Sequence, residues 1–186
     1  VPEVSSRAAE VLERSLDAVD EPEVRVEILR KLVERSEPRL DLATRLLDLY
    51  AELGRGKEAF ALVLASARAL PREVALWDRG EALARELEDP EPLAALYEQA
   101  LRSGMPDEEA IELGQRAVAF YEEWFEDGGR VASVLQLLLE IQPQDLWAFD
   151  RLKLIYDAQE RWDDLFALYD GAAATADAGR KVELLE

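Results

Sequence analysis

Three adjacent pairs of carboxylates are the groups in this sequence best suited to chemistry. They are Glu108 and Glu109, Glu122 and Glu123, and Asp163 and Asp164. Two carboxylates can serve as general acid and general base, or can bind a hard cation such as Ca²⁺. Adjacent residues of a helix, however, point about 100° apart around its axis, so the members of each pair diverge. We therefore expect these pairs to be solvated helix surface or partners of a helix dipole.

Other catalytic chemistry lacks its usual residues. The chain contains no histidine and no cysteine, so it has neither the commonest general base at neutral pH nor thiolate ligands for a metal. Serine, threonine and lysine are present, but no histidine can activate them. No glycine-rich phosphate loop of the GxxxxGKS or GxxxxGKT form occurs. The sequence therefore predicts no enzyme, no metal and no cofactor.

The net negative charge of the chain disfavours two classes of partner, nucleic acids and anionic membranes. There are 41 acidic and 22 basic residues, for a formal net charge of −19, which repels nucleic acids and anionic membranes.

No apolar run approaches the roughly 20 residues that span a bilayer, and residues 1–10 lack the layout of a signal peptide. We therefore expect a cytoplasmic protein. Its excess of Arg over Lys, beside abundant Ala and Leu, is compatible with a GC-rich bacterial source.

An internal repeat organises the elements that must position any site. The short turn before each second helix of a pair is marked by Pro22, Gly56, Pro90, Gly128 and Trp162, which are 34, 34, 38 and 34 residues apart. Seven residues after the markers stand Leu29, Val63, Tyr97, Leu135 and Tyr169, all large and apolar. Three residues further stand Leu32, Ser66, Ala100, Leu138 and Ala172, mostly small or aliphatic. This spacing places the side chains on one face of a helix, as a buried stripe.

Helix pairs follow from this repeat and from the prolines between pairs, which cannot continue a helix. We predict first helices at residues 5–19, 39–53, 73–87, 108–126 and 145–159. Second helices are predicted at residues 22–36, 57–70, 91–103, 129–142 and 162–176. The additional residues of the 38-residue step, within 103–108, should lengthen a loop or a helix start and leave the stack intact.

The residues of the second pair resemble a tetratricopeptide repeat. They are Leu46, Tyr50, Gly54, Ala59, Val63 and Pro71, at the spacing of that family. The fifth pair is similar, with Phe149, Leu152, Tyr156, Trp162, Leu165, Tyr169 and Ala172. Departures are Leu47, Lys153, Glu122, Glu160, Leu93 and Leu165, which stand where the family favours other residues. Glu160, for example, replaces a turn glycine, and Leu93 replaces a packing alanine.

This resemblance implies an all-α fold, a right-handed superhelical solenoid of about five antiparallel helix pairs in one domain of residues 1–186. The repeats would be residues 5–38, 39–72, 73–106, 107–144 and 145–178. Residues 179–186 would start a further helix, so we expect a fragment of a longer array. Because one helix pair cannot bury both of its apolar faces, stability should accumulate between neighbouring repeats. An irregular helical bundle is the structural alternative.

The resemblance also implies a concave groove lined by one face of each first helix. Carried over onto this sequence, that face consists of Asp48, Glu52, Asp78, Arg85, Glu86, Arg116, Phe120, Glu123, Trp124, Trp147, Asp150 and Asp157. Seven of these twelve residues are acidic and two are basic, so the groove should be negative, with an aromatic patch toward its C-terminal half. The four aromatic residues between 120 and 125 span more than one helix face, so at least one should be poorly buried.

We interpret the chain as a scaffold that binds a protein or peptide carrying basic residues around an apolar anchor. A structural or self-assembly module, stacking through an open repeat end such as residues 180–186, is the alternative. A third interpretation is the recruiting arm of an enzyme whose catalytic domain lies elsewhere. An exposed aromatic patch favours the first interpretation, an uncapped apolar end the second, and an adjoining domain the third.

Overall fold

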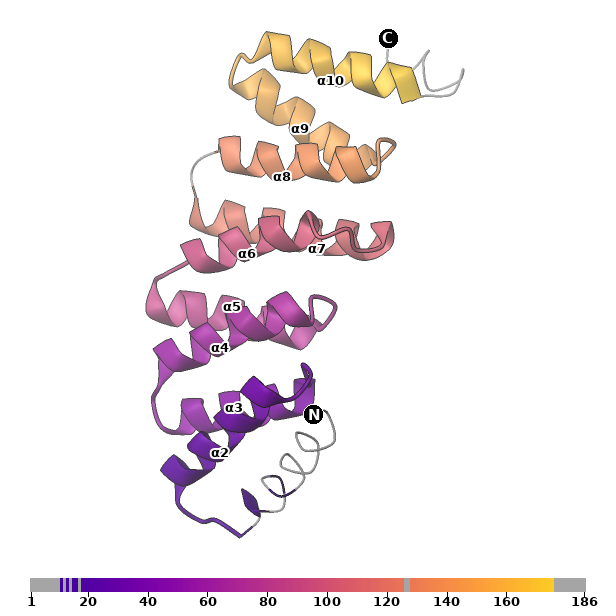
Figure 1. Cartoon of the computed structure of the whole chain (residues 1–186). Helices are drawn as coiled ribbons and strands as arrows, with labels where there is room; N and C mark the ends of the chain where they lie inside the picture. Colours follow the sequence, from indigo (N-terminus) through magenta and orange to yellow (C-terminus); the bar gives the residue numbers. More distant parts are fainter. Residues whose placement is uncertain (1–10, 12, 14, 17, 126–127, 176–186) are drawn as a thin grey trace. The chain divides into compact units, whose positions relative to one another are not determined.

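The computed structural model describes residues 11, 13, 15, 16, 18–125 and 128–175, and these contain helices and short turns but no strand (Figure 1). The all-α class predicted from the sequence is confirmed. Contacts within the chain divide it into two compact units, residues 1–96 and 97–186. The interpretation of residues 1–186 as one domain with a superhelical course stays a prediction.

Unit 1 contains α2 (Pro22–Arg35), α3 (Leu40–Glu52), α4 (Gly56–Ala69), α5 (Val74–Leu87) and the first part of α6 (Glu91–Leu101). Helices that follow one another in the sequence pack together: α2 on α3, α3 on α4, and α4 on α5. Turns of a few residues join them, so the chain reverses at the end of each helix (Figure 1). Spatial order therefore follows sequence order within this unit, as a helix-pair repeat requires.

Unit 2 contains the rest of α6, followed by α7 (Asp107–Trp124), α8 (Gly128–Ile141), α9 (Leu146–Ala158) and α10 (Trp162–Thr175). Here α7 packs on α8, α8 on α9, and α9 on α10. The longer α7 begins after the irregular segment of residues 102–106, where the sequence predicted the additional residues of the 38-residue step. Each described helix from α2 to α10 begins and ends within two residues of its predicted range. The helix predicted at residues 5–19 lies largely outside the described residues.

Three repeat-equivalent turns contain a residue in the left-handed backbone region. Gly54, Glu88 and Glu160 each lie two residues before a turn marker and have φ angles of 65°, 53° and 55°. Glycine adopts this conformation without a Cβ clash, whereas an L-residue is strained there by roughly 1–2 kcal/mol. The family preference for glycine at these turns therefore has its physical cause in the backbone, and two of the turns carry glutamate against it.

The predicted apolar stripe forms the core of both units. Leu29 and Val63 in unit 1, and Tyr97 and Leu135 in unit 2, are buried, whereas the fifth member of the stripe, Tyr169 on α10, is only half-buried. A small residue on the neighbouring helix explains how the chain accommodates Leu93, one of the departures from the repeat pattern. Leu93 occupies a position where the family favours alanine, and a Cβ placed at Gly80 would lie 3.1 Å from Leu93 Cδ1. Because Gly80 has no side chain, the large Leu93 side chain fits against α5.

Candidate functional site

The first-helix face of unit 1 consists of the predicted groove residues of α3 and α5. Asp48 and Glu52 on α3, and Asp78, Arg85 and Glu86 on α5, are all exposed. The Asp48 carboxylate pairs with the guanidinium of Arg79, so an ion pair joins these two first helices directly. The face is therefore acidic but carries a basic residue that the sequence analysis did not include.

A small cavity of about 240 Å³ opens between α3, α5 and the turn that precedes α4. Its apolar lining includes Leu47, Ala51 and Leu83, and its polar lining includes Arg79 and Glu86. Of the five predicted residues in this unit, only Glu86 lines the cavity. Arg79 could have been found from the sequence, because it lies seven residues before Glu86 and therefore on the same helical stripe.

One of the predicted α7 residues, Phe120, belongs to the core of unit 2, and another, Arg116, is half-buried beside it. Phe120 is 2% exposed, and its ring centroid lies 5.6 Å from that of Tyr97 and 6.3 Å from that of Trp124. The Arg116 Nε donates a hydrogen bond of 3.1 Å to the Tyr97 hydroxyl. Phe120 is thus closed to a ligand in this structure, unlike the surface position that the resemblance implied. Its burial is caused by α6, which places Tyr97 against it.

Trp124 and Phe125, at the C-terminal end of α7, are the partly exposed members of the aromatic cluster. The ring of Phe125 lies 5.4 Å from that of Tyr121 and under the guanidinium of Arg130, which is 4.2 Å from its centroid. The indole nitrogen of Trp124 is covered and has no hydrogen-bond partner among the described residues. Both side chains are of intermediate exposure, so the expectation that at least one of the four aromatic residues is poorly buried stays a prediction.

Trp147 at the start of α9 is the second half-buried tryptophan of this unit. The guanidinium of Arg151, one turn later, lies 5.4 Å from the Trp147 ring centroid and also pairs with Glu122 of α7. A cation over an aromatic face and an ion pair both fix the arginine, and through it the indole. Neither Glu122 nor Arg151 was among the predicted groove residues. The repeat spacing does suggest Arg151, because it lies 11 residues before its turn marker, as Arg79 does in unit 1.

The remaining predicted residues, Glu123 on α7 and Asp150 and Asp157 on α9, are exposed. We call the surface of α7 and α9 that carries Trp147, Arg151, Asp150 and Glu122 the tryptophan face. Trp124 follows Glu122 by two residues, about 200° around α7, and so lies on another side of that helix. The tryptophan face combines apolar surface with carboxylates and with one arginine that is already engaged.

Two further properties of the described residues bear on function. They contain no group of three or more His, Cys, Asp or Glu side chains that could hold a metal ion. Within the same residues, no helix is both long enough and apolar enough to cross a membrane.

No protein-family model matches the chain, and no curated protein matches it. Three solved structures are similar to it at a low level. The crystal structure of MamA protein is 10% identical, with a TM-score of 0.40 over 94% of this chain and 92% of that chain. The MamA RS-1 ArsTM double mutant is 11% identical, with a TM-score of 0.37 over 94% and 97% of the two chains. MamA 41-end from Desulfovibrio magneticus RS-1 is 14% identical, with a TM-score of 0.35 over 91% and 89%. Function is therefore inferred from this chain's own residues.

Proposed function

We propose that this chain is a helical-repeat scaffold that binds a peptide or partner protein through its first helices, chiefly at the tryptophan face of unit 2. The observation that carries the proposal is the half-buried indole of Trp147, held by Arg151, which is itself paired with Glu122. Aromatic side chains at the centre of an interface supply much of its affinity. An indole that is already fixed loses little conformational entropy when it binds.

The charges around the indoles favour a ligand with basic residues beside an apolar anchor. Asp150 is exposed on the same helix as Trp147, and Glu123 is exposed beside Trp124. Apolar groups of the ligand would pack on the Trp147 indole, while its lysines or arginines would face these carboxylates. In such an interface, buried aromatic contacts determine most of the affinity, and rim charges mainly change the association rate and its dependence on salt.

The test begins with affinity capture by the unmodified chain from a lysate of its source organism and mass spectrometry of the captured proteins. A partner peptide is then titrated against Trp147→Ala, Trp124→Ala and Asp150→Asn by calorimetry. Trp147→Ala should weaken binding by about 2 kcal/mol at low and high salt, whereas Asp150→Asn should weaken it mainly at low salt.

Trp162→Ala is the matched control, because Trp162 is 50% exposed but belongs to α10 rather than to the tryptophan face. It should bind the partner as the unmodified chain does. Circular dichroism of every variant separates a binding defect from unfolding. Unchanged affinity in Trp147→Ala, with the fold intact, would reject this face as the binding site, and a defect in Trp124→Ala alone would move the site to the other side of α7.

Self-assembly is a second candidate function, favoured by one observation on α10. Phe166 is 69% exposed and lies one turn after the half-exposed Trp162, so together they form an apolar strip on the helix surface. Sedimentation of the unmodified chain and of Phe166→Ser would test it. A concentration-dependent oligomer that the substitution abolishes would support self-assembly, and a monomer at all concentrations would reject it.

A further inference from the structure

Each unit contains a groove between two consecutive second helices, on a different surface from the first-helix faces. The N-terminal groove, of about 480 Å³, is bounded by α2, α3 and α4. The C-terminal groove, of about 400 Å³, is bounded by α8, α9 and α10. Eleven of the twelve residues that line the C-terminal groove lie 106 residues after a residue that lines the N-terminal groove. The same part of the repeat is therefore hollow in both units.

The inside of the C-terminal groove is mainly apolar. Leu152 and Tyr156 of α9 form its floor, and Leu139 of α8 and Leu168 of α10 contribute to its walls. The Tyr156 hydroxyl accepts a hydrogen bond of 2.5 Å from Gln136 Nε2, which satisfies the polar end of that side chain. Burial raises the pKa of Tyr156, as expected for a phenol in weakly polar surroundings.

The two walls of the C-terminal groove each carry a carboxylate. Glu140 stands on α8 and Asp164 on α10, and no basic residue lines this groove. Asp164 accepts a hydrogen bond of 2.8 Å from Arg161, whereas Glu140 has no ion-pair partner among the described residues. The Arg161 guanidinium also lies 4.5 Å from the centroid of the Tyr156 ring. A ligand in the groove would therefore meet the Glu140 carboxylate, unpaired among the described residues, on one wall and, on the other, an Asp164 carboxylate that Arg161 partly neutralises.

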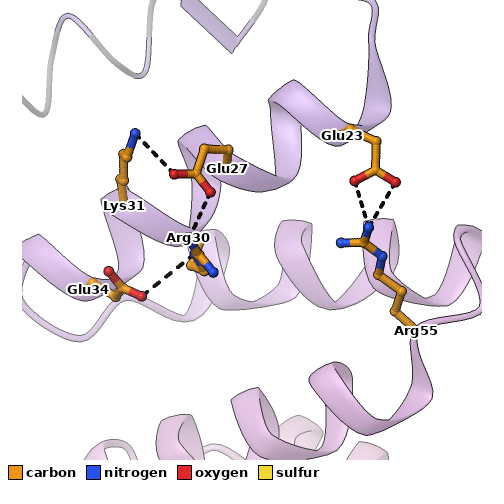
Figure 2. A network of polar contacts seen from close by, with 6 residues as sticks. All are labelled: Glu23, Glu27, Arg30, Lys31, Glu34 and Arg55. Carbon is orange, nitrogen blue, oxygen red and sulfur yellow. Dashed lines mark hydrogen bonds and ion pairs between the residues drawn. The ribbon is translucent and has the colours of Figure 1, made fainter.

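The N-terminal groove has the same carboxylates but is less negative. Glu34 and Glu58 are the equivalents of Glu140 and Asp164, yet Arg30 stands where the other groove has Gln136. The Arg30 guanidinium lies 2.8 Å from a Glu27 carboxylate oxygen and 3.8 Å from one of Glu34 (Figure 2). Arg30 neutralises part of the negative charge at the rim of the N-terminal groove. The two grooves therefore have the same architecture but differ in charge.

From this arrangement we propose that the C-terminal groove is a docking site for an amphipathic helix of a partner protein, with lysines or arginines on both sides of its apolar stripe. Its volume lies within the roughly 300–1,000 Å³ of pockets that hold compact ligands, and a helix lies naturally between two others over an apolar floor. Glu140, which has no ion-pair partner in the part of the chain that the structure describes, and Asp164, which Arg161 only partly neutralises, select basic flanks. This site is separate from the tryptophan face, because α9 contributes Leu152 and Tyr156 here and Trp147 there.

The probe for the test is a fluorescein-labelled helical peptide of Leu, Ala and Lys, with leucines on one face and lysines on both sides of them. A second peptide carries Glu in place of Lys. Fluorescence anisotropy with the full chain should show binding of the Lys peptide and little binding of the Glu peptide. Because the Lys peptide also has the chemistry proposed for the tryptophan face, it is titrated against Trp147→Ala as well. Binding retained in Trp147→Ala but lost on blocking the groove assigns the peptide to the groove, and the reverse result assigns it to the tryptophan face, so failure of the proposed function and failure of this site are distinguishable.

Gly171 permits a blocking variant. It lines the groove, and a Cβ placed there would meet no atom within 4 Å. Gly171→Leu should therefore fill the groove without disturbing the fold and weaken binding of the Lys peptide by about tenfold or more. Ala65→Leu, the equivalent change in the N-terminal groove, is the matched control and should have little effect. Glu140→Lys should weaken binding several-fold at low salt and less at high salt.

Three results would overturn the proposal. One is the absence of binding by the Lys peptide. A second is equal affinity of the peptide for Gly171→Leu and the unmodified chain, which would mean that it binds the tryptophan face or the acidic surface in general. The third is a dimer of the unmodified chain that Gly171→Leu dissociates, because the occupant would then be a second copy of this chain.

Discussion

The second helices α4 and α10 are the same element of the repeat, 106 residues apart, and they differ in how much of their apolar surface is covered. Phe60 on α4 is 5% exposed, whereas its equivalent on α10, Phe166, is 69% exposed. Helix α4 packs on both α3 and α5, and a Cβ placed at Gly80 of α5 would lie 3.1 Å from Val63 of α4. Helix α10 packs on α9, and no described helix follows it.

The difference shows where the burial of a repeat helix originates. Phenylalanine stands at the same repeat position in both helices, so the residue type does not decide its exposure. The next first helix decides it, because that helix covers the side of α4 that faces away from α3. On α10, Tyr169 still contacts α9, with its ring 5.4 Å from Phe149. Stability in such a stack accordingly belongs to the interfaces between neighbours more than to single helices.

The largest effect should separate Phe60→Ala from Phe166→Ala. Removal of the buried ring should lower the free energy of unfolding by about 3–5 kcal/mol, since a cavity remains in the core. Removal of the exposed ring should change it by no more than about 0.5 kcal/mol, since the site is already hydrated. Urea unfolding followed by circular dichroism measures both. Comparable losses of stability in the two variants would mean that Phe166 is covered in solution. The difference in burial between α4 and α10 would then be rejected.

A smaller effect concerns the turns that precede α4 and α10. Gly54 and Glu160 are equivalent and both left-handed, but only the glutamate has a Cβ to strain the backbone. Glu160→Gly should therefore raise the free energy of unfolding by about 1 kcal/mol, and Gly54→Glu should lower it by a similar amount.

Glu160→Ala is the control for this prediction, because alanine keeps the Cβ but removes the charge. It should not stabilise the chain, so any gain specific to Glu160→Gly reports on the backbone. If alanine and glycine stabilise equally, the carboxylate rather than the left-handed conformation is the cause.

Helix positions were predictable from the sequence because their signals are local. The turn markers, prolines and apolar spacing placed α2 to α10 within two residues of their observed ends. The exchange of size between Gly80 and Leu93 was not predictable, because it depends on which residues of different helices touch. Taken alone, each of these residues is only a departure from the repeat pattern.

The candidate site was less predictable than the fold. Phe120 and Trp124 lie one turn apart on α7, and the sequence treated them alike. Contact with Tyr97 buries Phe120, while Trp124 near the helix end stays partly exposed. Periodicity assigns a residue to a face of its own helix but does not tell how far the neighbouring helix extends over that face. Arg79 and Arg151 were missed for another reason, because their ion pairs join different helices and the spacing within one helix does not show those pairs.

A pH-dependent effect should be shared by both units. Burial raises the pKa of Tyr50 in the N-terminal groove and of Tyr156 in the C-terminal groove. A raised pKa means that the folded chain holds the phenol proton more tightly than the unfolded chain. The resulting stability is present below the unfolded pKa of about 10 and is lost as the pH rises through the folded pKa.

The free energy of unfolding should therefore fall as the pH rises above about 10, and less steeply in Tyr50→Phe and in Tyr156→Phe. Urea unfolding at several pH values measures the slope for each variant relative to the unmodified chain. A slope that neither substitution reduces would show that other groups control alkaline unfolding.

The smallest effect should come from the ion pairs that join consecutive first helices. Asp48 pairs with Arg79 in unit 1 and Glu122 with Arg151 in unit 2, and the four side chains are 37–53% exposed. Exposed pairs contribute about 0.2–1 kcal/mol, and salt weakens them as the Debye length falls from about 30 Å at 0.01 M to about 10 Å at 0.1 M.

The two arginines differ in one respect, because only Arg151 is known to lie over an indole, that of Trp147. A cation over an aromatic ring adds about 0.5–1 kcal/mol at an exposed site. Double-mutant cycles for both pairs should therefore give similar coupling energies that shrink with salt, while Arg151→Ala should destabilise the chain more than Arg79→Ala does at either salt concentration. Equal losses for the two arginine variants would indicate that the contact with Trp147 contributes nothing, and would weaken the case for an indole held ready to bind.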